Sequence, residues 1–388
     1  MGKRVRAVRS GDRISSIDIL RGFALLGIVL VNILGFNATF FDFGGYYNNL
    51  PDETQQHFYN IYISLTADKF IFLFSFLYGY GIFIQYHRFQ KRGQNFPPFF
   101  TRRMSGLALF GVLHIVLLWA GDILFLYAIA GMILLLLRRL KTAWLLLLAL
   151  FFYFFIGIWL FIDVWLPLPD AMSSTCTECL SKAIEGYASG NYADALWIRL
   201  HEYAAFRYIN LFYYLPKIIG ISLFGFIASK FNLHQLIKNS RKKWALTWVA
   251  ISVMAVLVYF NYEKMVDFES PFANAVYMSG YELMNILIAA SWIVLILLLA
   301  SVERLAAILK PVALVGRASL TNYILQSLIL SLIFYGWGFG IIGQTNVKLL
   351  ALIALLVYAF QLIINMVWFT YYDRGPLERL WRKWSYGG

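Results

Sequence analysis

Residues 104–138 read MSGLALFGVLHIVLLWAGDILFLYAIAGMILLLLR and decide the fold class. A turn at 120–122 separates two apolar blocks, and arginine pairs at 102–103 and 138–139 lie outside them. A helix of about 20 predominantly apolar residues crosses the ~30 Å hydrocarbon core of a bilayer. Because no water satisfies backbone groups there, each block is predicted to be helical. The stretch therefore predicts a transmembrane hairpin whose two ends return to one basic side.

The rest of the chain repeats this pattern. Of its 388 residues, 61% are hydrophobic and 14% are charged, and the mean hydropathy is +0.67. The apolar residues form long blocks, whereas helices of a large soluble core would carry charged stripes. We predict an all-α polytopic membrane helix bundle of about ten transmembrane helices. The predicted spans are 17–36, 64–86, 104–120, 122–138, 142–166, 208–229, 244–262, 279–300, 317–336 and 348–371.

The basic residues predict the orientation of this bundle. Of the 33 Lys and Arg residues, 25 fall in alternate loops on one side, five on the other, and three in or beside spans. The positive-inside rule then predicts an even number of spans with both termini in the cytoplasm. Since loop placement explains the net charge of +13, no nucleic-acid partner is expected. The first apolar block lacks a small-residue cleavage site, so it is interpreted as a retained helix.

The predicted spans divide the chain into three parts. Residues 1–166 form an N-terminal half with spans one to five, and 208–388 form a C-terminal half with spans six to ten. The extracytoplasmic connection 167–207 lies between them. In it, apolar residues recur at helical spacing, which predicts an amphipathic helix on the outer surface or a cap over a cavity. These residues are Ala193, Leu196, Trp197, Leu200 and Ala204.

Two cysteines occur in the same connection. Cys176 and Cys179 are too few for a zinc site, so we expect no metal and interpret them as a disulfide or two free thiols.

Four ionisable side chains are predicted in the outer half of the membrane: His57, Asp68, His114 and Asp122. Ionisable residues within spans are functional candidates by default. A histidine oriented by a carboxylate suits general base catalysis on a hydroxyl or amine, so the four could line one outward-facing pocket. The structural alternative is that Asp68 pairs with Lys69 or another helix, Asp122 caps a helix, and each histidine makes one interhelical hydrogen bond.

A second polar group is predicted near the cytoplasmic face. Asn322 and Gln326 share a face of the ninth span, and Gln361 and Asn365 share a face of the tenth. They form either a polar seam entered from the cytoplasm or interhelical hydrogen bonds worth about 1 kcal/mol each.

Asp18 and Arg21 are spaced i, i+3 at the start of the first span. They form a local ion pair, or Arg21 meets an anionic ligand. The chain has no Walker A, Gly-x-Ser-x-Gly or HExxH motif, and residues 79–81 (Gly-Tyr-Gly) are interpreted as close helix packing.

Several segments together resemble the YeiB-like family of bacterial membrane proteins. They are RISSIDILRGFALLGI at 13–28, LH at 113–114, LWAGDIL at 118–124, GRASLTNY at 316–323 with Gln326-Ser327, and GPLE at 375–378. The resemblance covers nearly the whole chain and implies a multi-pass protein of the bacterial cytoplasmic membrane.

YeiB-like proteins resemble distant members of the transmembrane acyltransferase superfamily, which includes lysosomal heparan-α-glucosaminide N-acetyltransferase. That resemblance implies transfer from cytoplasmic acyl-CoA, with acetyl-CoA the first candidate, through a histidine near the outer face. The lysosomal enzyme's histidine precedes a Leu-Thr-x-Ala-Asp stretch. Here His57 precedes Leu-Thr-Ala-Asp at 65–68, one residue out of register, and His114 lies in a YeiB-like segment. Two candidate bases therefore remain.

The leading hypothesis is a membrane acyltransferase. His57 or His114 acts as the base and Asp68 or Asp122 orients it. The acyl-CoA is expected to meet the inner polar residues, namely Arg21, Asn322, Gln326, Gln361 and Asn365. The expected partners are the bilayer and an extracytoplasmic glycan, lipid or small-molecule acceptor. A homodimer is a further possibility. The alternatives are a transporter or flippase of a small metabolite or lipid precursor, and a non-catalytic scaffold.

Overall fold

The computed structural model describes residues 14–42, 46–47, 50, 52–163, 177–262 and 271–387, and every regular element in these ranges is helical. Seven segments are long and apolar enough to cross a membrane. They are α1 (Ser15–Asn37), α3 with α4 (Glu53–Thr66 and Lys69–Lys91), α5 (Phe96–Leu117), α11 through η3 to α12 (Arg207–Ile209, Asn210–Tyr214 and Leu215–Lys230), α14 (Arg241–Tyr262), α15 (Pro271–Ala300) and α19 (Val347–Tyr371). The prediction of an all-α polytopic membrane bundle is confirmed.

Three shorter apolar helices coincide with the remaining predicted spans: α6 (Leu124–Leu137), α7 (Thr142–Tyr153) and α18 (Ser319–Phe334). Several predicted boundaries were wrong; the eighth span, for example, begins at Pro271 rather than at 279. The third span begins at Phe96 rather than at 104, because Pro97 and Pro98 fit the first turn of a helix, where no N–H is needed. The fifth span is divided at Phe154 into α7 and α8 (Phe155–Asp163).

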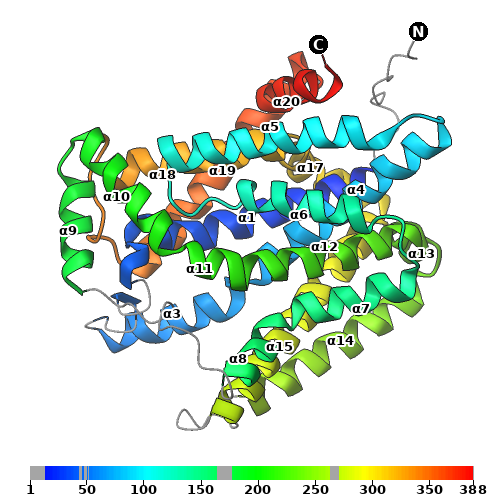
Figure 1. Cartoon of the computed structure of the whole chain (residues 1–388), viewed down its shortest axis with the longest axis horizontal. Coiled ribbons are helices and arrows are strands. Elements are labelled where there is room, and N and C mark those ends of the chain that lie inside the picture. The colour runs from blue at the N-terminus through cyan, green and yellow to red at the C-terminus, as the bar shows by residue number, and fades with distance from the viewer. Residues whose placement is uncertain are drawn as a thin grey trace.

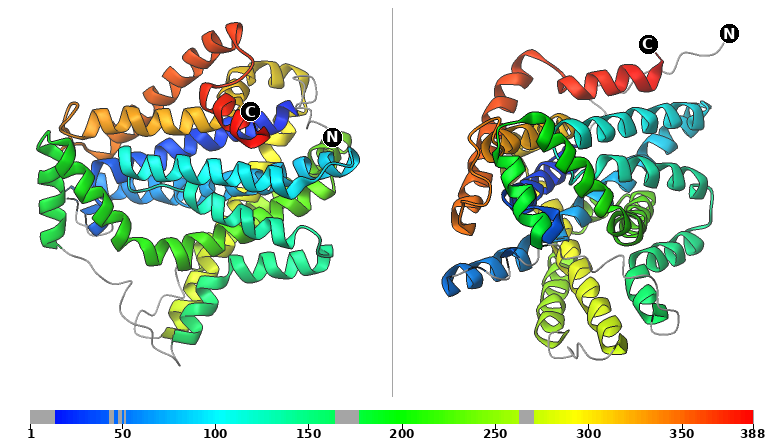
Figure 2. Two further views of the ribbon diagram at one scale, coloured as in Figure 1. Left: turned by 45° about the horizontal axis from the view of Figure 1, so that its top comes forward. Right: turned by 60° about the vertical axis from the view of Figure 1, so that its left-hand side comes forward.

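The long helices run side by side, and short helices lie at both ends of the bundle (Figure 1). Helices α9 (Thr177–Ala188) and α10 (Tyr192–Ala205) cross one end, and α13 (Leu233–Asn239) lies at the other. The first pair belongs to the predicted outer connection and α13 to a predicted cytoplasmic loop. In Figure 2, α20 (Pro376–Tyr386) lies against one flank of the bundle together with α5, while α14 and α15 form the opposite flank.

The amphipathic helix predicted in the outer connection is α10. Trp197 and Leu200 are exposed, whereas Ala195, Arg199 and Glu202 are buried. Polar contacts with other segments hold this face, so α10 caps the bundle and leaves its apolar stripe free for the membrane interface. Cys176 of the predicted cysteine pair lies outside the described residues.

Glycines bring α4 and α12 into close contact. A Cβ atom on Gly79 of α4 would lie 1.7 Å from the Ser222 carbonyl oxygen, and one on Gly225 of α12 would lie 1.8 Å from that of Phe76. Small residues allow such close approach in membranes, where helix association depends on packing. The interpretation of Gly79 as a packing residue is confirmed, whereas Gly81 lines a cavity, where a Cβ atom on it would lie 3.2 Å from Arg21 Nη2.

Candidate functional site

A cavity of about 320 Å³ lies among the predicted cytoplasmic halves of α1, α4, α5 and α18. The short helices α17 (Lys310–Arg317) and α20 close it on one side. Along α4, its lining extends from Arg88 to Phe74, which is about 21 Å of helix rise. The cavity therefore reaches roughly two-thirds of the way across a ~30 Å hydrocarbon core.

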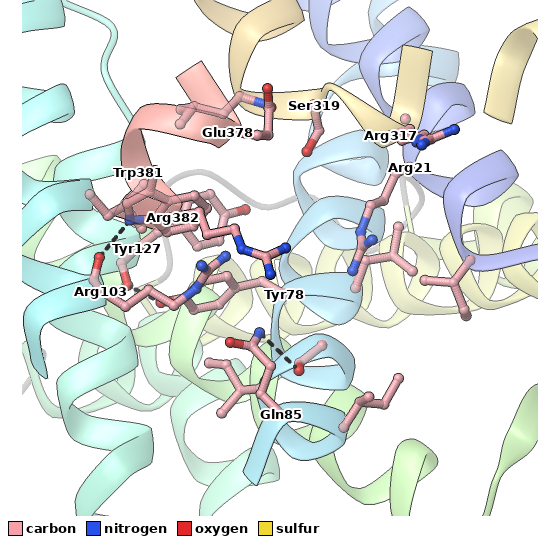
Figure 3. Close-up of a pocket in the computed structure, with 18 of the residues that line it drawn as sticks. Arg21, Tyr78, Gln85, Arg103, Tyr127, Arg317, Ser319, Glu378, Trp381 and Arg382 are labelled. Atoms are coloured by element: carbon pink, nitrogen blue, oxygen red, sulfur yellow. Dashed lines mark hydrogen bonds between the residues drawn. The ribbon is translucent and has the colours of Figure 1, made fainter. Parts of the chain in front are cut away.

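Positive charge dominates the lining of this cavity. Six arginines line it, against two carboxylates: Arg21, Arg88, Arg103, Arg317, Arg374 and Arg382, with Asp18 and Glu378. The side chains of Arg21, Arg103 and Arg382 point into one space from three different helices (Figure 3). Guanidinium groups arranged in this way favour a phosphate or carboxylate ligand.

Both carboxylates already have partners within the protein. Asp18 Oδ1 accepts a hydrogen bond from Arg21 at 3.0 Å, so the predicted local pair is present. Glu378 Oε1 accepts the backbone N–H groups of Leu320 and Thr321 at 2.7 and 3.1 Å and thereby caps α18. Burial raises the pKa of the Glu378 carboxyl.

Aromatic residues of α20 hold part of the arginine set in place. The Arg103 guanidinium lies 3.6 Å from the ring centroid of Trp381, and the indole N–H of Trp381 donates to the Arg103 carbonyl at 2.7 Å. Arg382 lies 5.4 Å from the ring of Tyr386 on the same helix. Stacking fixes the direction of a guanidinium group while leaving its edge N–H groups available to a ligand.

A buried histidine lies beyond the deep end of the cavity, the end that is farthest from the cytoplasmic side. His114 Nδ1 lies 3.0 Å from Asp122 Oδ2, and both side chains are 0% exposed. On the other edge of the ring, Nε2 lies 2.8 Å from Ser327 Oγ. Asp122 Oδ1 also accepts the Phe125 N–H at 2.8 Å, so the carboxylate caps α6 as well as facing His114. The ring is thus held between a carboxylate and a hydroxyl, as a general base requires.

Tyr323 separates the cavity from this histidine. It lines the cavity, and its ring centroid lies 5.1 Å from that of His114. The Tyr323 hydroxyl is buried and has no hydrogen-bond partner among the described groups. Leu124 and Tyr127 from the start of α6 complete this inner wall.

The amino-acid sequence is similar to several bacterial proteins without an assigned function. Residues 228–388 match the family described as "Protein of unknown function (DUF418)". The chain is 29% identical to the "Uncharacterized protein YxaH" of Bacillus subtilis, over 97% of this chain and 95% of that protein. It is 26% identical to the "Uncharacterized protein YeiB" of Escherichia coli, over 96% of each. Over nearly its whole length the chain is therefore similar to these YeiB-like proteins. The YeiB-like segments quoted above supply Arg21, Asp122, Tyr323 and Glu378 to the cavity and its deep end.

A second polar cluster contains Asp68. Lys217 Nζ lies 2.7 Å from Glu282 Oε1 and 3.3 Å from Asp68 Oδ2. Tyr213 and Tyr281 donate to Asp68 Oδ2 at 3.1 and 3.0 Å. Of the alternatives considered for Asp68, the structure therefore shows pairing with another helix, and Asp68 does not contact His114.

The four outer candidates do not form one pocket, which corrects the sequence-based prediction. His114 and Asp122 come together, Asp68 belongs to the second cluster, and His57 is exposed on α3. The reason is a sharp bend in the chain: Asp68 has a φ of +61° and divides α3 from α4. His57 is thereby placed on a helix that leaves the main bundle (Figure 1).

The four inner amides also differ from the open seam that was expected. Asn322 and Asn365 exchange two hydrogen bonds at 3.2 and 2.9 Å, and Gln326 donates to Gln361 Oε1 at 2.8 Å. All four are buried, and none lines the cavity, unlike Arg21. They join α18 to α19 through interhelical hydrogen bonds, so we do not retain them as cofactor ligands.

Sequence reasoning missed Arg103, Arg382, Tyr323 and Ser327. Arg103 and Arg382 were counted as loop charges that set topology. Tyr323 and Ser327 were quoted for the family resemblance without a role. The i, i+4 spacing of Arg382 and Tyr386 on one helix was a local signal for an aromatic–cation pair, whereas the pairing of Arg103 with Trp381 joins distant segments.

Proposed function

We propose that this protein is a membrane acyltransferase of the bacterial cytoplasmic membrane. It would move an acyl group from cytoplasmic acyl-CoA to a hydroxyl or amine of a glycan, lipid or small molecule at the outer face. The observation that supports this is an arginine-lined cavity whose deep end lies one side chain away from His114. Coenzyme A carries its phosphates at one end of a long, flexible molecule and its thioester at the other, which fits such a cavity.

In this proposal the residues have distinct roles. Arg21, Arg103 and Arg382 bind the phosphates at the cytoplasmic end. His114 accepts the proton of the group that attacks the thioester, and Asp122 orients the ring and stabilises the imidazolium that forms. His114 Nδ1 and Asp122 Oδ2 are close, but their contact does not have the direction of a hydrogen bond.

Transport or flipping of a small metabolite or lipid precursor is the second candidate. The cluster of Lys217, Glu282 and Asp68 favours it, because buried charges of this kind occur in proton and ion relays of transporters. This cluster does not line the arginine cavity, so the two candidates depend on different residues.

Binding of acetyl-CoA to the purified protein in lipid nanodiscs tests the proposal. Removing one charge-assisted phosphate contact costs about 1.5–3 kcal/mol, so Arg382→Ala should weaken binding at least roughly tenfold by calorimetry. Arg379→Ala is the matched control, since Arg379 lies on the same helix, stacks on Tyr372 and does not line the cavity. If the native protein does not bind acetyl-CoA, or binds it equally well without Arg382, the acyltransferase proposal fails.

A further inference from the structure

Ser327 completes an ordered set of three buried side chains where α18 meets the turn between α5 and α6. Its Oγ lies 2.8 Å from His114 Nε2, while Nδ1 of the same ring lies 3.0 Å from Asp122 Oδ2. Taken as whole residues, backbone included, Ser327 is 1% exposed and His114 is 2% exposed. Serine, histidine and carboxylate in this order form the catalytic triad of many acyl-transfer enzymes, in which the histidine activates the serine hydroxyl.

We propose that Ser327 takes the acyl group from acyl-CoA and holds it as an ester before it passes to the acceptor. This inference rests on the proposed acyltransferase function. Ser327 Oγ attacks the thioester carbonyl, forming a C–O bond as the C–S bond breaks. His114 Nε2 receives the hydroxyl proton and passes it to the departing CoA thiolate. In the second step the acceptor attacks the ester, and its proton returns through His114 to Ser327 Oγ.

The position of Ser327 gives a physical reason for two steps. It is the ninth residue of α18, which has 16 residues, so it lies near the middle of that helix. The arginine cavity approaches from the cytoplasmic side, whereas the acceptor is proposed to arrive from the outer side. A covalent intermediate would let CoA leave before the acceptor enters, so the two substrates need not occupy the membrane interior together.

Tyr323 is suitably placed to assist the same step. It lies one helical turn before Ser327 and lines the deep end of the cavity. Its buried hydroxyl donates to none of the described groups, so its proton is available to the oxygen that becomes negative during attack. An oxyanion donor and a nucleophile would then act from one face of α18.

The competing explanation is that Ser327 only satisfies the buried histidine. Serines within helices commonly donate to the carbonyl four residues earlier, and Ser327 Oγ also lies 3.4 Å from the Tyr323 carbonyl oxygen. Ser331 provides a matched control, because it lies one turn further along α18, is 0% exposed and donates to the Leu328 carbonyl at 2.9 Å. Among the described hydrogen bonds, none joins Ser331 to His114.

The test uses acetyl-CoA labelled in the acetyl group and the full-length protein in nanodiscs. After binding, the protein is denatured, separated from free CoA and examined by scintillation counting and peptide mass spectrometry. We expect the native protein and Ser331→Ala to retain label on the peptide that contains Ser327, and Ser327→Ala to retain none. His114→Ala should acquire label at least roughly a hundredfold more slowly. Ser327→Cys should retain label as a thioester that hydroxylamine removes at neutral pH.

Two controls separate the possible failures. Each variant is first tested for acetyl-CoA binding, so a loss of label in a variant that still binds reports chemistry rather than misfolding. If the native protein binds acetyl-CoA but never retains label, or if Ser327→Ala releases CoA at the native rate, direct transfer replaces the serine ester and the acyltransferase proposal stands. If the native protein does not bind acetyl-CoA, both proposals fall.

Discussion

Lys217 illustrates how buried charge constrains single residues of this protein. Its side chain is 2% exposed and contacts the carboxylates of Glu282 and Asp68. Lys69 is buried beside this cluster and lies 5.7 Å from the ring centroid of Tyr281. Desolvating an ion is expensive, so the charge of Lys217 is tolerated because two carboxylates and the Tyr213 hydroxyl surround it.

Replacing Lys217 by Met should destabilise the protein by about 3 kcal/mol or more, because two carboxylates lose their shared counter-ion. Adding Glu282→Gln to that variant should recover part of the loss, since the two side chains interact directly. The free energy of unfolding can be measured by denaturant titration in detergent, with Lys238→Met on exposed α13 as the control. Equal losses in the single and double variants would contradict the coupling.

At the scale of elements, the docking of α10 depends on polar contacts of its buried face. Arg199 donates to the Leu118 carbonyl at the end of α5 at 3.1 Å. Glu202 accepts the Phe40 N–H at 2.9 Å and the Tyr187 hydroxyl at 2.6 Å. These contacts tie α10 to three other segments, so the cap covers the end of α5 that carries His114.

Glu202 should make this docking sensitive to pH. Burial raises the pKa of its carboxyl from 4.5 to about 7, so the folded state binds a proton more readily than the unfolded state. The protonated form favours folding below pH ~4.5, and this contribution is lost as the pH rises to about 7. The full change is about 3 kcal/mol. Thermal unfolding followed between about pH 5 and 8 should show the native protein losing stability with rising pH.

Glu202→Gln should flatten this dependence, because the amide does not titrate. Glu185→Gln on the exposed face of α9 is the control and should keep the native slope. An unchanged slope in Glu202→Gln would show that another group is responsible.

At the scale of the whole molecule, orientation determines what the cavity can bind. The arginine cavity lies toward the predicted cytoplasmic side, and α9 and α10 close the opposite end (Figure 1). If the predicted orientation is reversed, cytoplasmic acyl-CoA cannot be the ligand of the arginines.

Single cysteines can test this orientation in a protein whose native Cys176 and Cys179 are replaced by serine. Ser189→Cys, between α9 and α10, should react with a membrane-impermeant maleimide in intact spheroplasts. Ser240→Cys, which follows α13, should react only after the membrane is permeabilised. Both side chains are exposed, so access to the reagent alone decides the result. The reverse labelling pattern would refute the predicted orientation.

The sequence alone was enough to predict the helical class, the insertion into a membrane and the positions of most spans. These depend on local properties: the length of an apolar block, the absence of charge within it and the charge of the flanking loops. Boundaries were wrong where local signals were overlooked, as at Pro97 and Pro98. The burial of Arg199 and Glu202 in α10 could not be predicted, because it depends on partners distant in the sequence.

Only the tertiary structure decided which polar residues act together. His114 and Ser327 are 213 positions apart, and Asp68 and Lys217 pair across α4 and α12. The spacing within a helix shows which side chains share a face, but not which neighbouring helix that face meets. That choice depends on helix rotation and close packing, and it placed the histidine between a carboxylate and a serine while closing the amides on one another.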